Sequence, residues 1–256
     1  MIDYTLHQQR DEEAGFTLVE LAVVMIIIGL LIGGVLKGQE LITNAEVSNT
    51  VQTVQTTDSA VLGFRDAYAA LPGDAPNAGV RIPNCGAAPC DPASGNQGNR
   101  HVENDNGTTL GLAITGDSEA HAFFIQLTEA DFISGIEPDA VNSETTYPSI
   151  PIGQNGVIQL NYSSGIASAT DAVAGAPTPR RGHWFVMHGD PGNGIDARFV
   201  EQAIAGRIDR KLDNGTANTG DVLAAESAAG LCSNAAGVYL EADRTPDCAL
   251  YISTSF

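Results

Sequence analysis

One uninterrupted apolar run occupies residues 16–36, near the start of the chain. Only Thr17 and Glu20 place polar side chains within it. A run of about 20 apolar residues is long enough to cross the hydrocarbon core of a bilayer as a helix. A carboxylate inside such a segment costs about 2.5–3.5 kcal/mol on insertion scales. Glu20 is therefore predicted to be a functional group that needs a partner.

The pattern of polar and apolar positions changes after this run but keeps a helical period. No proline occurs before Pro72, so nothing interrupts a helix over residues 16–70, about 80 Å long. The second part of this helix is predicted to be amphipathic and to pack one face on a globular domain. Its apolar residues recur at intervals of three, four and seven: Val47, Val51, Val54, Val61, Phe64, Tyr68 and Leu71.

The rest of the chain predicts shorter elements. Pro72 and Gly73 end the long helix, because proline removes a backbone donor and glycine supplies a turn. The segment 75–116 is rich in Gly, Pro, Asn and Asp and predicts a long loop. Periodicity predicts helices over residues 117–135 and 195–212, and strands over residues 156–162, 183–188, 238–240 and 249–252. The prediction is an α+β fold, with the long helix packed on a domain that holds a small antiparallel sheet.

Composition narrows the classes of function. The 256 residues are 43% hydrophobic, which is enough for a packed core. The net charge is −19, from 12 basic and 31 acidic residues, and this disfavours nucleic acid as a partner. His183, His188 and Asp190 lie close in sequence, but no Gly-x-Ser-x-Gly, His-Glu-x-x-His or phosphate-loop motif accompanies them. We therefore expect no enzymatic activity.

The four cysteines form two pairs that are local in sequence, Cys85 with Cys90 and Cys232 with Cys248. An even number of cysteines on the exported side of a membrane predicts two disulfides. Three pairings are open, and the local one closes the shortest loops. A metal site of Cys85, Cys90 and His101 is the alternative, although the other spacings fit no zinc pattern.

One segment offers hard oxygen ligands for calcium. Asp213, Asn214, Asn218 and Asp221 lie in a loop that contains glycine, which is the ligand chemistry that Ca²⁺ prefers. The spacing is not that of an EF-hand. The alternative is a plain Asp/Asn/Gly turn without a metal. No other cofactor is expected.

The residues at the start of the apolar run carry a resemblance to a known family. Gly15-Phe16-Thr17-Leu18-Val19-Glu20 resembles the prepilin signature of type IV pilins and pseudopilins. The resemblance implies that a membrane peptidase cuts between Gly15 and Phe16 and that the new terminal residue, Phe16, is N-methylated. It also implies that Glu20 pairs with the terminal amine of a neighbouring subunit in a filament. Residues 68–74 and 208–215 resemble segments of a subset of pilin-like proteins.

The resemblance also implies an organisation of the chain. We expect a cleaved leader over residues 1–15, a transmembrane and assembly segment over 16–36, an amphipathic segment over 37–71 and a globular domain over 72–256. Prepilin leaders are typically basic, whereas this one is acidic. The implied location is the inner membrane, with the domain in the periplasm, and then a filament.

Three functions follow as hypotheses. The first is a structural subunit of a type IV pilus-type filament, whose partners are other pilins, the prepilin peptidase and N-methyltransferase, and the inner-membrane assembly machinery. The second is a pseudopilin of a type II secretion system. The third, from another class, is a membrane-anchored binding protein or adhesin that does not polymerise.

Overall fold

The computed structural model describes residues 17–92, 97–102, 118–137, 147–152, 156–163, 165, 180–189, 199–225 and 232–256. The chain divides into two compact units, Met1–Ile42 and Thr43–Phe256.

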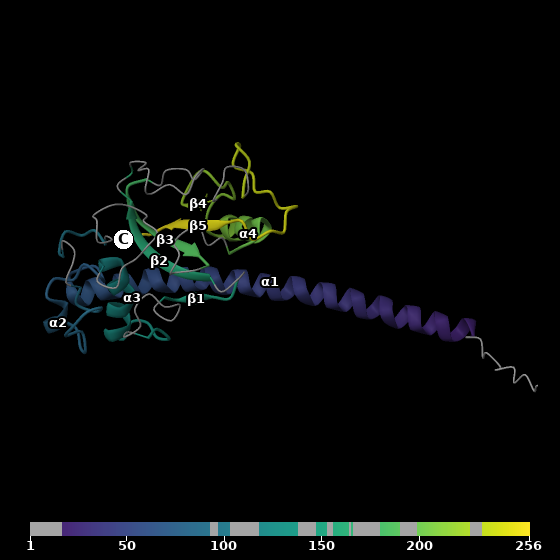
Figure 1. Cartoon of the computed structure of the whole chain (residues 1–256), viewed down its shortest axis with the longest axis horizontal. Helices are drawn as coiled ribbons and strands as arrows, with labels where there is room; N and C mark the ends of the chain where they lie inside the picture. The colour runs from purple at the N-terminus through teal and green to yellow at the C-terminus, as the bar shows by residue number, and fades with distance from the viewer. Residues whose placement is uncertain are drawn as a thin grey trace, which may run out of the picture. The chain divides into compact units, whose positions relative to one another are not determined.

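A single helix, α1 (Leu18–Tyr68), provides the described part of the first unit and the beginning of the second (Figure 1). This confirms the predicted long helix, which ends two residues earlier than expected. In the first unit the large apolar side chains of α1 are exposed throughout, from Leu18 at 89% to Leu36 at 62%. Within the described part of the chain, α1 alone is long and apolar enough to cross a membrane.

The second unit is built on a five-stranded sheet with the order β1-β2-β3-β5-β4 (Figure 1). Every neighbouring pair is antiparallel, and Phe185 of β3 lies opposite Leu160 of β2 on one side and Ile252 of β5 on the other. The predicted α+β class and the small antiparallel sheet are confirmed. The strands are β1 (Ser149–Ile150), β2 (Gly156–Ser163), β3 (Gly182–His188), β4 (Val222–Ala225) and β5 (Ala249–Ser253).

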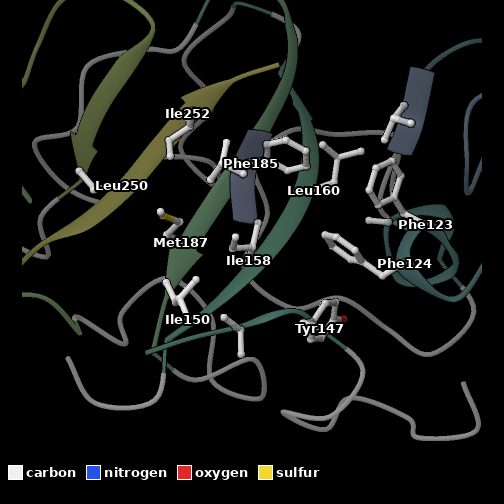
Figure 2. Packing of buried hydrophobic residues seen from close by; sticks show 14 of the residues in the cluster. Phe123, Phe124, Tyr147, Ile150, Ile158, Leu160, Phe185, Met187, Leu250 and Ile252 are labelled. Atoms are coloured by element: carbon white, nitrogen blue, oxygen red, sulfur yellow. The ribbon is translucent and has the colours of Figure 1, made fainter. Parts of the chain in front are cut away.

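The second part of α1 packs its predicted apolar face into the core of this unit. Val47, Val54, Val61 and Phe64 are all buried there. The sheet and α3 (Glu119–Glu129) supply the rest of the core. Figure 2 shows part of this core, including Phe123 and Phe124 of α3, Leu160 of β2 and Phe185 of β3.

Several predicted element boundaries are wrong. The helix predicted over 117–135 is the shorter α3, which begins after Ser118, whose hydroxyl accepts the N–H of His121 at 3.3 Å, and ends at Glu129. The helix predicted from residue 195 begins only at Gln202, as α4 (Gln202–Leu212). Just before it, Val200 is held extended, because its N–H and C=O both bond to Cys248. Residues 195–198 lie outside the described part.

Other elements were missed or replaced. Residues 238–240 do not form a strand, and only a bridge between Ser233 and Tyr239 is found there. The short strands β1 and β4 were not predicted. A single helical turn, α2 (Ala78–Arg81), lies within the segment predicted to be a loop.

Candidate functional site

The first turn of α1 holds the candidate assembly carboxylate in a reciprocal cap. Oε2 of Glu20 accepts the backbone N–H of Thr17 at 3.0 Å and its hydroxyl at 2.8 Å. The backbone N–H of Glu20 points back to Oγ1 of Thr17 at 3.3 Å. This is a capping box, in which the residue before the helix and the third residue of the helix satisfy each other's donors. Sequence reasoning assigned no role to Thr17, although the Thr-x-x-Glu spacing was the signal for one.

The cap leaves part of the carboxylate available. Within the described residues, the bonds that Glu20 accepts all go to Oε2. An ionised carboxylate can accept about four hydrogen bonds, so Oε1 can still accept a donor from outside the chain. The positive end of the helix dipole also favours a negative charge at this position. Gly15 and Phe16 lie outside the described residues, so the predicted cut and methylation remain predictions.

The predicted calcium ligands lie in one loop but bond mainly to that loop. Oδ2 of Asp213 accepts the N–H groups of Asp221 at 2.6 Å and Val222 at 3.4 Å. Asn214 bonds within the same loop, and Asp221 pairs with Arg180. No group of three or more His, Cys, Asp or Glu residues in the described part could hold a metal ion. A calcium ion could also be bound by amide oxygens such as that of Asn218. The calcium site therefore stays a prediction.

A buried carboxylate fixes the base of this loop. Asp209, on the last turns of α4, is fully buried and accepts the hydroxyl of Tyr239 at 2.9 Å and the N–H of Gly215 at 2.9 Å. Burial raises the pKa of Asp209 above its usual range, and the two hydrogen bonds oppose that rise. Because a buried polar group is costly without partners, the bond to Gly215 ties the end of α4 to the loop that follows it, and the bond to Tyr239 ties it to the segment 232–256.

Both local disulfides are present, Cys85–Cys90 and Cys232–Cys248. Because Cys85 and Cys90 bond to each other, neither provides the thiolate that the alternative metal site would need. The third member of that alternative, His101, stacks on Tyr162 with ring centroids 4.0 Å apart.

His183 and His188 are both buried. Nε2 of His183 accepts the backbone N–H of Val102 at 3.1 Å. Burial, together with the nearby charge of His101, lowers the pKa of His183 to about 4, so its ring is neutral at pH 7. His188 is 1% exposed at the end of β3, and Asp190 lies outside the described residues.

Comparison with known proteins identifies a motif that includes the first turn of α1. Residues 10–36 match the protein family described as the prokaryotic N-terminal methylation motif. The chain therefore carries the prepilin-type signature, which spans Gly15, Phe16 and Glu20. No curated protein and no solved structure matches the chain. The motif indicates a structural, type IV pilin-like or pseudopilin-type protein, and with the apolar part of α1 it is consistent with anchoring in a membrane.

Proposed function

We propose that this protein is a structural subunit of a type IV pilus-type filament, cleaved before Phe16 and assembled through the first part of α1. The observation that carries the proposal is the carboxylate of Glu20, which lies inside the methylation motif and keeps one oxygen available beside the start of an otherwise apolar helix. The methylated amine of a neighbouring Phe16 is the donor proposed for that oxygen. No catalytic step is part of the function.

The energetics of assembly set what Glu20 must do. Moving an apolar helix from lipid into a bundle of similar helices gains little hydrophobic free energy, because lipid is itself apolar. A charge in that environment, in contrast, is costly unless it is paired and hydrogen-bonded. Pairing Glu20 with an incoming amine therefore favours the correct register of two subunits. Packing between helices and an assembly machine that acts from the cytoplasm supply the remaining work.

Substitution of Glu20 in the native host tests this proposal. We expect Glu20→Ala and Glu20→Gln proteins to be absent from sheared filaments, whereas the wild-type chain is present. Glu40→Gln is the matched control, because Glu40 lies on the same helix in an exposed pair with Lys37 at 2.7 Å, which is worth little. Mass spectrometry of the wild-type protein should find a mature chain that starts at methylated Phe16.

The outcomes separate the three hypotheses. A mature protein that retains Met1 in assembling cells contradicts the proposal. Normal localisation and activity of Glu20→Ala, with no filament formed by the wild type, favours the anchored binding protein. Loss of secreted enzymes on deletion, without loss of a surface filament, favours the type II secretion pseudopilin.

A further inference from the structure

A cavity of about 720 Å³ opens in the second unit beside the last turn of α1. Ligand sites in proteins typically have volumes of about 300–1,000 Å³ and combine an apolar wall with a few polar groups. Here the apolar wall comes from Leu71, Pro76 and Phe256. Arg65 from α1 and Arg100 from the loop after the first disulfide also line the cavity.

The N–H donors of both guanidinium groups are available to a ligand. Neither the Arg65 nor the Arg100 side chain makes a hydrogen bond or ion pair with another residue in the described part of the chain. By contrast, the guanidinium groups of Arg180 and Arg210 pair with Asp221 and Glu241. Only 12 of the 256 residues are basic, and two of them line this cavity together with two carboxylates, Asp66 and Asp74.

Asp74 fixes the position of Arg100. The Asp74 side chain is 2% exposed, and its carboxylate accepts the backbone N–H groups of Gly98, Asn99 and Arg100. The preceding residue, Gly73, donates its N–H at 2.6 Å to Oε1 of the buried Gln126. The loop that carries Arg100 is thus held against the turn that ends α1, and Arg100 has the rarely populated φ of +68°. Such backbone conformations occur where the surrounding structure enforces them, often at ligand sites.

Three features oppose an anion in the cavity. The C-terminal end of α1 carries partial negative charge, whose effect is reduced by solvent and salt at an exposed site. Arg81 offsets part of it, since its side chain donates to the carbonyl of Tyr68. The carboxylates of Asp66 and Asp74 also line the cavity and repel an anion, although that of Asp74 already accepts three backbone N–H groups. Arg65 and Arg100 are both exposed, so each contributes most where an anion accepts two parallel N–H bonds from one guanidinium group.

We propose that this cavity binds a small organic anion, with a carboxylate or phosphate group held by Arg65 and Arg100 and an apolar body packed on Leu71, Pro76 and Phe256. The guanidinium fork suits both of these oxyanions. His183 lines the cavity, is neutral at pH 7 and already accepts the N–H of Val102. It therefore forms part of the cavity wall but contributes no positive charge to anion binding. This site does not depend on filament assembly.

Binding of para-fluorobenzoate to the full-length protein in non-ionic detergent tests the proposal. Fluorine NMR reports the probe, and neutral para-fluorobenzyl alcohol reports partition into the micelle. We expect saturable binding of the acid, weakened about tenfold by Arg65→Gln or Arg100→Gln and more by the double variant. Arg244→Gln is the matched control, because Arg244 is an exposed arginine that does not line the cavity. Asp66→Asn should tighten binding, because it removes the repelling carboxylate.

Competition then distinguishes the sources of the oxyanion. Displacement by inorganic phosphate identifies a phosphate site, and displacement by acetate identifies a carboxylate site; either result supports the proposal. Equal binding by the wild type and the double arginine variant, with both folded as shown by their unfolding midpoints, overturns it. So does binding of the neutral alcohol as tight as that of the acid. Glu20→Ala should bind the probe normally, so a failure of this site and a failure of the proposed function are separable.

Discussion

The two parts of α1 belong to one helix, yet they differ in what covers them. In residues 18–42 the large aliphatic side chains are exposed, and no residue of that segment is buried. In residues 43–68 a stripe from Val47 to Phe64 is buried against the sheet and α3. A helix that is apolar all round needs lipid or other helices to cover it, whereas an amphipathic helix needs only one partner surface. The second part finds that surface within its own chain, and the first part has to find its cover in a membrane or in neighbouring copies.

The largest difference between the two parts should appear on truncation of a large side chain. Phe64 is fully buried and packs on Tyr68 and Phe132, with ring centroids 4.5 and 6.0 Å away. We expect Phe64→Ala to lower the free energy of unfolding of the domain by about 3–5 kcal/mol. Leu31→Ala, at a side chain 61% exposed, should leave it unchanged. Denaturant unfolding of the detergent-solubilised chain measures both, and equal effects would remove the distinction.

Two glycines, Gly73 in the domain and Gly33 in the first part of α1, test the same difference in packing. A Cβ on Gly73 would lie 2.3 Å from the backbone oxygen of Glu119, and the residue has a φ of +83°. Gly73→Ala should therefore destabilise the domain by about 2–4 kcal/mol. A Cβ on Gly33 would meet no other atom within 4 Å, so Gly33→Ala should only raise helix propensity, by about 1 kcal/mol. A domain unfolding midpoint that Gly73→Ala leaves unchanged would contradict the close approach.

Acid should affect the domain more than the first part of α1. The pKa of His183 is lowered from 6.5 to about 4, first by burial and then by the charge of His101. The unfolded chain therefore takes up a proton near pH 6.5, which the folded domain takes up only near pH 4. The stability from this group is complete above pH 6.5 and is lost as the pH falls to about 4, by at most about 3 kcal/mol. The raised pKa values of Asp74 and Asp209 act in the opposite direction.

The histidine variant isolates this contribution. His183→Gln keeps an acceptor for the N–H of Val102 but does not titrate. The difference in unfolding free energy between wild type and variant should shrink as the pH falls from 6.5 to 4. A difference that is constant over this range would show that His183 does not carry the proton linkage. Far-UV circular dichroism should retain the helical signal of residues 18–42 throughout.

The same contrast explains what could be predicted from the sequence. The long helix, its buried stripe and strands β2, β3 and β5 follow from local periodicity, which extends over many residues. The two-residue strand β1 and the four-residue β4 have no such signal, because partners distant in sequence define them. Val200 shows the limit, since its helical spacing is overridden by pairing with Cys248. The motif identified Glu20, but Arg100 lines the same cavity as Arg65 because Asp74 holds the loop that carries it.

The smallest expected effect lies at the very start of α1, and it separates local order from domain stability. Thr17→Ala removes the hydroxyl that both donates to the Glu20 carboxylate and accepts its N–H. Loss of a helix cap costs about 1 kcal/mol, so amide exchange in the first turn should quicken about fivefold while the domain unfolding midpoint stays the same. Thr17→Ser keeps the hydroxyl and should exchange like the wild type. If Thr17→Ala instead left first-turn exchange unchanged, the hydroxyl of Thr17 would not contribute to holding Glu20, and only the backbone N–H of residue 17 would remain as a partner of the carboxylate within the helix.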